Sequence, residues 1–134
     1  MRKLLAIALL AAFAGTASAQ VAVDWTWKKD HRCNNVSPAL EVTGIPEGTK
    51  TLAFQMNDLD FRNKDHGGGK IPHESGNAAS VPEGALTANY LGPCPNNFSS
   101  FGHAYQITVR ALGADGAELA RGMKSKDFNA QTAK

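Results

Sequence analysis

The chain has 134 residues and a formal net charge of +2. This length suits one domain with a real hydrophobic core and excludes two full domains. No cluster of Lys and Arg lies beyond the N-terminal residues, which argues against a nucleic-acid footprint or a basic membrane-surface patch.

The first nineteen residues have the pattern of a secretory leader. A positively charged pair precedes the apolar run 4–13, and a small-residue stretch ends in Ala17-Ser18-Ala19. The run is shorter than the about 20 residues of a membrane-spanning helix. We therefore expect cleavage after Ala19 and one exported domain over 20–134, located in a periplasm or secreted; a retained N-terminal anchor is the alternative. Because two of the 14 basic residues belong to the leader, the domain carries as many basic as acidic residues.

Hydrophobic alternation then predicts a series of short strands. Strands are expected over residues 21–27, 39–43, 49–56 and 103–112, with weaker strand potential over 75–86. Turn residues follow at 113–116; residues 117–120 fit a strand or a short helical turn, and 128–134 are expected to fray. Short strands without a long helical period predict an all-β fold, namely a single antiparallel β-sandwich.

Residues 57–72 interrupt this pattern because they are polar and contain three consecutive glycines, Gly67 to Gly69. A long irregular segment in a small domain is usually functional or mobile. We expect a flexible loop whose backbone N–H groups could bind an anion. The His-Gly-Gly-Gly sequence is similar to an esterase oxyanion segment, but no Gly-x-Ser-x-Gly nucleophile motif accompanies it.

Two cysteines, Cys33 and Cys94, are present. An even count in an exported chain favours a disulfide, which would close a loop of about 60 residues and contribute about 4 kcal/mol by chain entropy. Two buried thiols or half of a metal site are the alternatives. No Cys-x-x-Cys or His-x-x-x-His spacing supports a metal, and the calcium-loop spacing is absent around 57–65.

Four further stretches occur in a fixed order. They are Ser37-Pro38-Ala39-Leu40, the run 51–60 ending in Asn57-Asp58-Leu59-Asp60, Gly92-Pro93-Cys94-Pro95, and Gly102-His103-Ala104-Tyr105 with the strand that follows it. Together they resemble the phosphatidylethanolamine-binding protein family, in its bacterial Raf-kinase-inhibitor-like branch. The resemblance implies a β-sandwich of that type with an anion pocket at one end.

The resemblance also assigns the pocket residues. It implies a ligand site formed by Asp58, Asp60, His66 or His73, Pro93, His103 and Tyr105. Asp58 would hold a histidine in its charged or correctly oriented form, and Tyr105 would share a face with His103 as pocket wall. In the simpler alternative, Asp58 and Asp60 are exposed loop residues that cap a turn. The matching alternative for His103 is a histidine at a strand end that only forms a hydrogen bond with a backbone carbonyl. His31 is expected at the surface.

The chain departs from the family pattern in three places. Leu59 and Arg62 replace the two prolines of the Asp-Pro-Asp-x-Pro loop, and His73 is followed by Glu74 where an aromatic residue is usual. The region after Leu112 is shorter than in most members, which implies a pocket that is either more open than is usual in the family or incomplete.

The sequence thus predicts an exported, non-catalytic binding protein for a small anionic or phosphorylated ligand, such as a phospholipid head group. No cofactor, metal, nucleic acid or stable membrane insertion is expected. A protein-interaction or inhibitor module that uses the same loops is one alternative, and a weak hydrolase using Asp58 and His103 is another.

Overall fold

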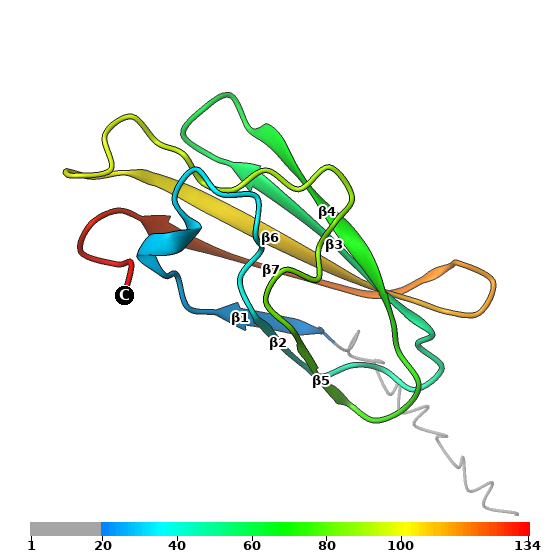
Figure 1. The fold of residues 1–134 in the computed structure, drawn as a ribbon. Coiled ribbons are helices and arrows are strands. Elements are labelled where there is room, and N and C mark those ends of the chain that lie inside the picture. The colour runs from blue at the N-terminus through cyan, green and yellow to red at the C-terminus, as the bar shows by residue number, and fades with distance from the viewer. Residues whose placement is uncertain (1–19) are drawn as a thin grey trace, which may run out of the picture.

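The computed structural model describes residues 20–134, so the predicted leader, 1–19, lies outside the described residues (Figure 1). Its elements are β1 (Ala22–Trp25), the short 3-10 helix η1 (Lys29–His31), β2 (Leu40–Thr43), β3 (Thr51–Asp58), β4 (Lys64–Pro72), β5 (Ala78–Val81), β6 (His103–Leu112) and β7 (Glu118–Phe128). Within this part of the chain, no helix is long and apolar enough to cross a membrane.

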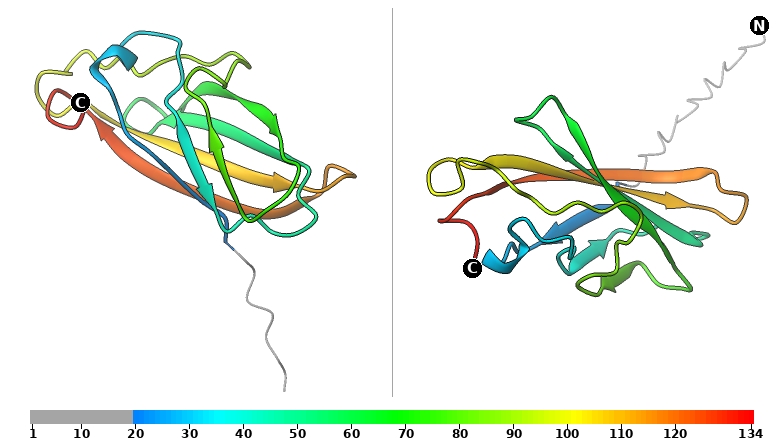
Figure 2. Two further views of the ribbon diagram at one scale, coloured as in Figure 1. Left: turned by 60° about the horizontal axis from the view of Figure 1, so that its bottom comes forward. Right: turned by 45° about the horizontal axis from the view of Figure 1, so that its top comes forward.

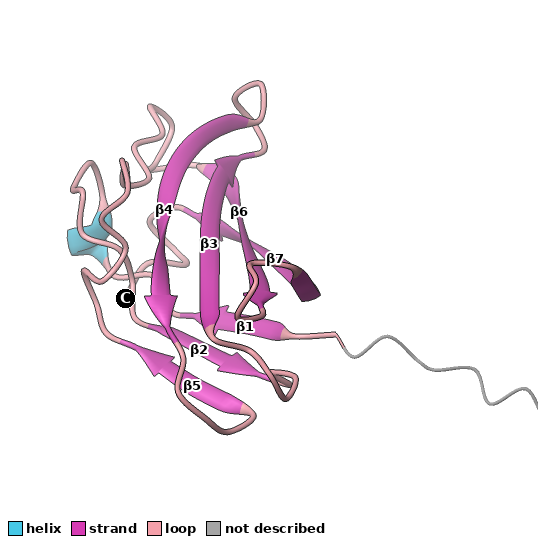
Figure 3. Cartoon of the chain, turned by 90° about the vertical axis from the view of Figure 1, so that its right-hand side faces the viewer, coloured by secondary structure: helices cyan, strands magenta, loops and turns pink. Residues whose placement is uncertain are grey.

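The strands form two facing sheets, which Figure 3 shows from the side. One sheet has the order β1-β2-β5 and the other β4-β3-β6-β7, and every strand pairing is antiparallel. The predicted antiparallel β-sandwich is therefore confirmed. The views in Figure 2 show that β6 and β7 run the length of the molecule, and that β6 begins and β7 ends on the side of the C-terminus.

The core follows from the alternation in the sequence. In β6 the inward side chains Tyr105, Ile107, Val109 and Ala111 are each 0% exposed. The other sheet contributes alternating Val and Trp side chains from the first strand and its flanks, 21–27, which are also buried. The four strands predicted with clear alternation are all present, and β6 has the predicted bounds.

The expected flexible loop around the three glycines is wrong, because this segment forms strand β4. Gly68 pairs with Gln55 of β3 on one side and forms a bridge with Ala88 on the other. A Cβ atom on Gly67 would lie 2.1 Å from the carbonyl oxygen of Asn89. The glycines therefore allow three backbone segments to approach closely, and that approach, not mobility, explains them.

The expected frayed C-terminus is also wrong. Strand β7 runs for 11 residues, and the residues after it fold back against the 3-10 helix region. Lys134 N–H donates to the carbonyl of Trp27 at 2.9 Å, and Lys29 N–H donates to the carbonyl of Lys134 at 2.9 Å. Ala133 is only 4% exposed, so the tail closes one edge of the core.

His31, expected at the surface, is 1% exposed and packs edge-on against Trp27. Its Nδ1 accepts a hydrogen bond from Lys28 N–H at 3.0 Å, so Nε2 carries the ring proton and points toward Glu83, 3.5 Å away. The polar residues 28–35 contain a buried anchor that hydrophobic patterning does not reveal, because a histidine counts as polar in such patterns.

Acidification is expected to destabilise the protein through His31. Burial lowers the pKa of His31 below its ordinary value of 6.5, partly opposed by the charge of Glu83. The unfolded chain then binds a proton more readily than the folded chain, so stability is lost as pH falls below about 6.5. Urea unfolding at pH 7.5 and 5.5 should show a larger loss for wild type than for His31→Gln. Equal losses in both proteins would contradict this role.

Candidate functional site

The candidate site lies at the end of the four-stranded sheet where β3 ends and β6 begins. The antiparallel register brings Asp58 opposite Tyr105 and opposite Lys64, so the end of one strand and the starts of two others share one edge. A hollow of about 330 Å³ opens there. It is lined by Asp58, Asp60, Phe61, Lys64, His66, Cys94, Asn96, His103 and Tyr105.

Asp58 and His103 form a close pair at the base of this hollow. His103 Nδ1 donates to Asp58 Oδ2 at 2.7 Å, and Asp58 is only 4% exposed. The other carboxylate oxygen of Asp58 accepts the N–H of Asp60 at 3.0 Å. Both oxygens are thus occupied, which fixes the ring of His103 with Nε2 as the nitrogen left for a ligand.

Asp60 stabilises the backbone at the same edge through hydrogen bonds. Its Oδ2 accepts the backbone N–H of Ala104 at 2.7 Å, and the N–H of the preceding residue, Leu59, donates to the Ala104 carbonyl. These bonds hold the loop after β3 against the start of β6. The Asp60 side chain thus bonds across to β6 and also borders the hollow, whereas the contact typical of a turn-capping acid is made by Asp58, whose Oδ1 accepts the N–H of Asp60.

Tyr105 supplies an unpaired hydroxyl. Its side chain is fully buried, and its hydroxyl oxygen has no hydrogen-bond partner among the described residues. Burial, and then the charge of Asp58, raises the pKa of this phenol, so the hydroxyl stays neutral and keeps its hydrogen. A buried hydroxyl without a partner is costly. Tyr105 borders the hollow, but its hydroxyl oxygen is itself buried, so a ligand oxygen reaches it only when the lining shifts.

Of the two histidines left open by the sequence, the structure brings only His66 to this site. His66 lines the hollow, packs edge-on against Tyr105 at 5.4 Å, and is held by a 2.9 Å bond between Nδ1 and the carbonyl of Leu91. His73 follows β4 at the opposite end of the sheet, where its N–H donates to Lys50. The length of β3 puts it about 25 Å from Asp58.

His73 instead borders a different, larger hollow of about 580 Å³ between the loops at 45–50 and 73–77. Its Nε2 donates to the carbonyl of Gly76 at 2.8 Å. His73 is therefore satisfied locally, and it shares no cavity with Asp58 and His103.

Pro93 lies one residue from the hollow, not in its lining. It is buried, and its carbonyl accepts the N–H of Cys33 at 2.8 Å. The predicted disulfide is confirmed: Cys33 and Cys94 are bonded, with their Cα atoms 4.5 Å apart. Cys94 itself lines the hollow, so the segment 91–96 forms one rim of the site.

Three lining residues were missed from the sequence: Phe61, Lys64 and Asn96. Lys64 places a cation at the start of β4, and Phe61 is 54% exposed beside it. Their positions depend on the turn between β3 and β4, for which the sequence offered no strand signal. No group of three or more His, Cys, Asp or Glu side chains within residues 20–134 is arranged to hold a metal ion.

A β-sandwich with a polar, histidine-containing hollow at one end defines the class of this protein. A model of the phosphatidylethanolamine-binding protein family matches residues 14–134. The chain belongs to this family.

Two solved structures share the fold. One is E. coli YbcL, described as a new member of the mammalian family, with a TM-score of 0.58, 19% identity, and coverage of 84% of this chain and 99% of that one. The other is CT736 of Chlamydia trachomatis, described as a putative homologue, with a TM-score of 0.51, 19% identity, and coverage of 84% and 100%. No curated protein matches the chain.

Proposed function

We propose that the hollow between β3 and β6 binds a small phosphorylated or otherwise anionic group without catalysing a reaction, in a compartment outside the cytoplasm. Family membership supports a binding function in general terms. The observation that carries the proposal is the buried Asp58–His103 pair beside the unpartnered hydroxyl of Tyr105.

The donors around the hollow suit an anion. Because Nδ1–H of His103 is committed to Asp58, the ring donates through Nε2 only in its doubly protonated form, in which the Asp58–His103 pair is neutral overall. Tyr105 donates a hydroxyl hydrogen, and Lys64 adds a positive charge at the opening. Charge-assisted hydrogen bonds of this kind are stronger than neutral ones, so a phosphoryl group fits the set.

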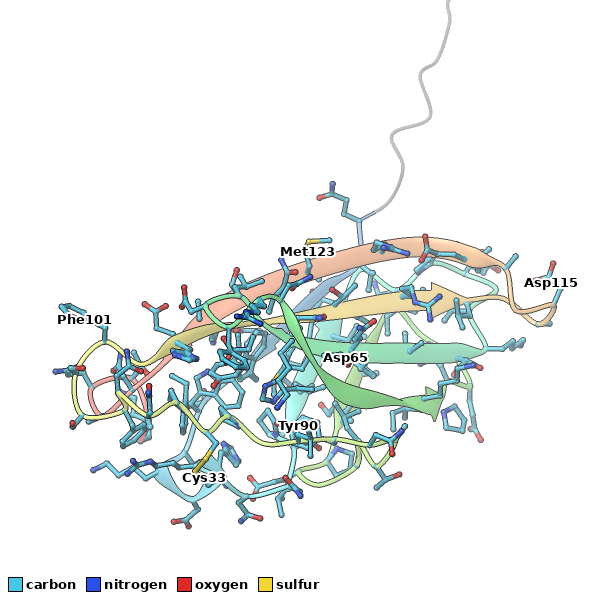
Figure 4. All side chains as sticks on the ribbon, turned by 90° about the horizontal axis from the view of Figure 1, so that it is seen from above. Cys33, Asp65, Tyr90, Phe101, Asp115 and Met123 are labelled. Atoms are coloured by element: carbon cyan, nitrogen blue, oxygen red, sulfur yellow. A yellow bond between two sulfur atoms is a disulfide. The ribbon has the colours of Figure 1, made fainter. Side chains whose placement is uncertain are left out.

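The alternative functions have less support. A hydrolase with a Ser or Thr nucleophile has no candidate in the described lining. Asp58 and His103 acting as an acid–base pair on water would need no such residue, and turnover with a bell-shaped pH profile is the result that would favour it. In a protein-interaction module, the glycine-rich segment would contribute an edge strand of the sheet and not a flexible loop. Exposed Phe101 and Phe61 at the same end could still contact a protein partner; Figure 4 shows Phe101 at the tip of its loop.

The test is an NMR titration of the oxidised protein with phosphoethanolamine and, separately, with inorganic phosphate. Saturable shifts are expected at Asp58, His66, His103 and Tyr105. Tyr105→Phe should weaken binding about tenfold without reducing stability, because the hydroxyl has no partner to lose in the free protein. Absence of shifts at millimolar ligand, or shifts centred on His73, would refute the proposal.

A further inference from the structure

The disulfide lies where it can control the proposed ligand site. Cys94 lines the hollow, while Cys33 belongs to the loop after η1. Both cysteines are exposed, and Figure 4 shows the sulfur–sulfur bond at Cys33 on the outer side of the molecule. Thiol–disulfide exchange requires access for the attacking thiolate, and this bond offers it.

Besides the disulfide, the rim segment 91–96 is attached by a few hydrogen bonds and by the burial of Gly92, Pro93 and Pro95. It belongs to neither sheet, and the loop that contains Cys33 holds it from outside. Cys33 N–H donates to Pro93 at 2.8 Å, and Gly92 N–H donates to Asn35 Oδ1 at 3.2 Å. The fit is close, because a Cβ on Gly92 would lie 1.9 Å from the carbonyl oxygen of Asn34.

The rim in turn positions a ligand-site side chain. Leu91 N–H donates to the carbonyl of His66 at 2.8 Å, and the carbonyl of Leu91 bonds His66 Nδ1 at 2.9 Å. His66 therefore depends on the rim for the orientation of its ring. If the rim moves away from Cys33, Leu91 moves with it, and His66 loses the carbonyl that orients its ring.

The backbone at Cys33 favours such a movement. Cys33 has φ of 53°, in the left-handed region that a residue with a side chain adopts at a cost. The cross-link and the hydrogen bond to Pro93 hold it there. Once the cross-link is broken, relaxation of this residue pulls on the remaining hydrogen bonds to the rim.

We propose that the Cys33–Cys94 disulfide is a redox switch of the ligand site, a proposal that rests on the anion-binding function above. A dithiol reductant cleaves the bond: its two electrons and two protons convert the two sulfurs to thiols, and the reductant becomes a disulfide. Reduction frees the rim 91–96 and lowers ligand affinity, while both sheets stay folded. Both cysteines lie outside the strands, and neither belongs to the buried core.

The experiment measures phosphoethanolamine binding by the oxidised and dithiothreitol-reduced protein, with amide hydrogen exchange followed in parallel. We expect the Kd to rise at least tenfold on reduction and to recover on reoxidation. The amide of Gly92 should lose its protection, while the amides of β6 keep theirs. Asn35→Ala, with the disulfide intact, should weaken binding several-fold because it removes one of the bonds that hold the rim.

Leu52→Ala is the matched control, because it destabilises the core at the opposite end of β3, and its Kd should equal that of the wild type. An unchanged Kd after reduction, a protected Gly92 amide, or exchange that spreads through β6 would each overturn the switch. If the oxidised protein fails to bind, the proposed ligand fails, and the exchange data at Gly92 still decide whether the rim responds to reduction.

Discussion

Replacing His103 by alanine is expected to weaken phosphoethanolamine binding by about 100-fold, or about 3 kcal/mol at 25 °C. The variant loses the donor at Nε2 and also strips Asp58 of its partner. A carboxylate that is 4% exposed, and that keeps only the N–H of Asp60 as a partner, then faces the incoming anion. Loss of a charge-assisted hydrogen bond together with charge repulsion accounts for an effect of this size.

Isothermal titration calorimetry of the oxidised protein measures this effect, and His73→Ala provides the matched control. His73 has the same side chain, is more buried than His103 and has one backbone carbonyl partner, but it lies at the opposite end of β3. Its replacement should leave the Kd unchanged. Equal losses in the two variants would show that the effect comes from general destabilisation, and no loss in either would remove His103 from the site.

The hydrophobic pattern predicted the frame of the sandwich because the buried faces of β3 and β6 alternate with polar faces. The same rule failed for β4, where the neighbours Phe54 and Asn89 come so close that the sequence uses glycines in place of apolar side chains. Strand β7 was largely missed as well, because its inner face includes Gly122 and Lys126, the latter paired with Asp24 at the edge of the sheets. A strand without apolar alternation gives no periodic signal.

For the site too, part of the arrangement could be predicted from the sequence and part is decided by the tertiary structure. The family resemblance placed Asp58 and His103 in one pocket without naming the histidine that Asp58 holds, and the register of β3 with β6 brings the two side chains to 2.7 Å. The choice between His66 and His73 could not be made from spacing, since both follow the same acidic loop. It depends on the pairing of β4 with β3 and on the irregularity near Gln55, which turns His66 toward the hollow.

Gly68→Ala is expected to have the largest effect on folding, with a loss of about 4 kcal/mol or more in the free energy of unfolding. The added Cβ would lie 1.8 Å from the carbonyl oxygen of Phe54 and 2.6 Å from its carbonyl carbon. These are backbone atoms of a central strand, so no side chain can rotate away, and β4 must separate from β3. That separation breaks the ladder on both sides of Gly68, including its two bonds to Ala88.

Gly69→Ala is the control for the Gly68→Ala prediction, since the nearest atom to its added Cβ is the Cα of Leu86 at 3.2 Å. A shift of a few tenths of an ångström relieves that contact, so we expect a loss of about 1 kcal/mol or less. Urea unfolding followed by circular dichroism compares the two variants. Similar stabilities would mean that the strands part at little cost and that β4 is the loop its composition suggests. A large difference between adjacent glycines would show that this run is required by close backbone packing and not by flexibility.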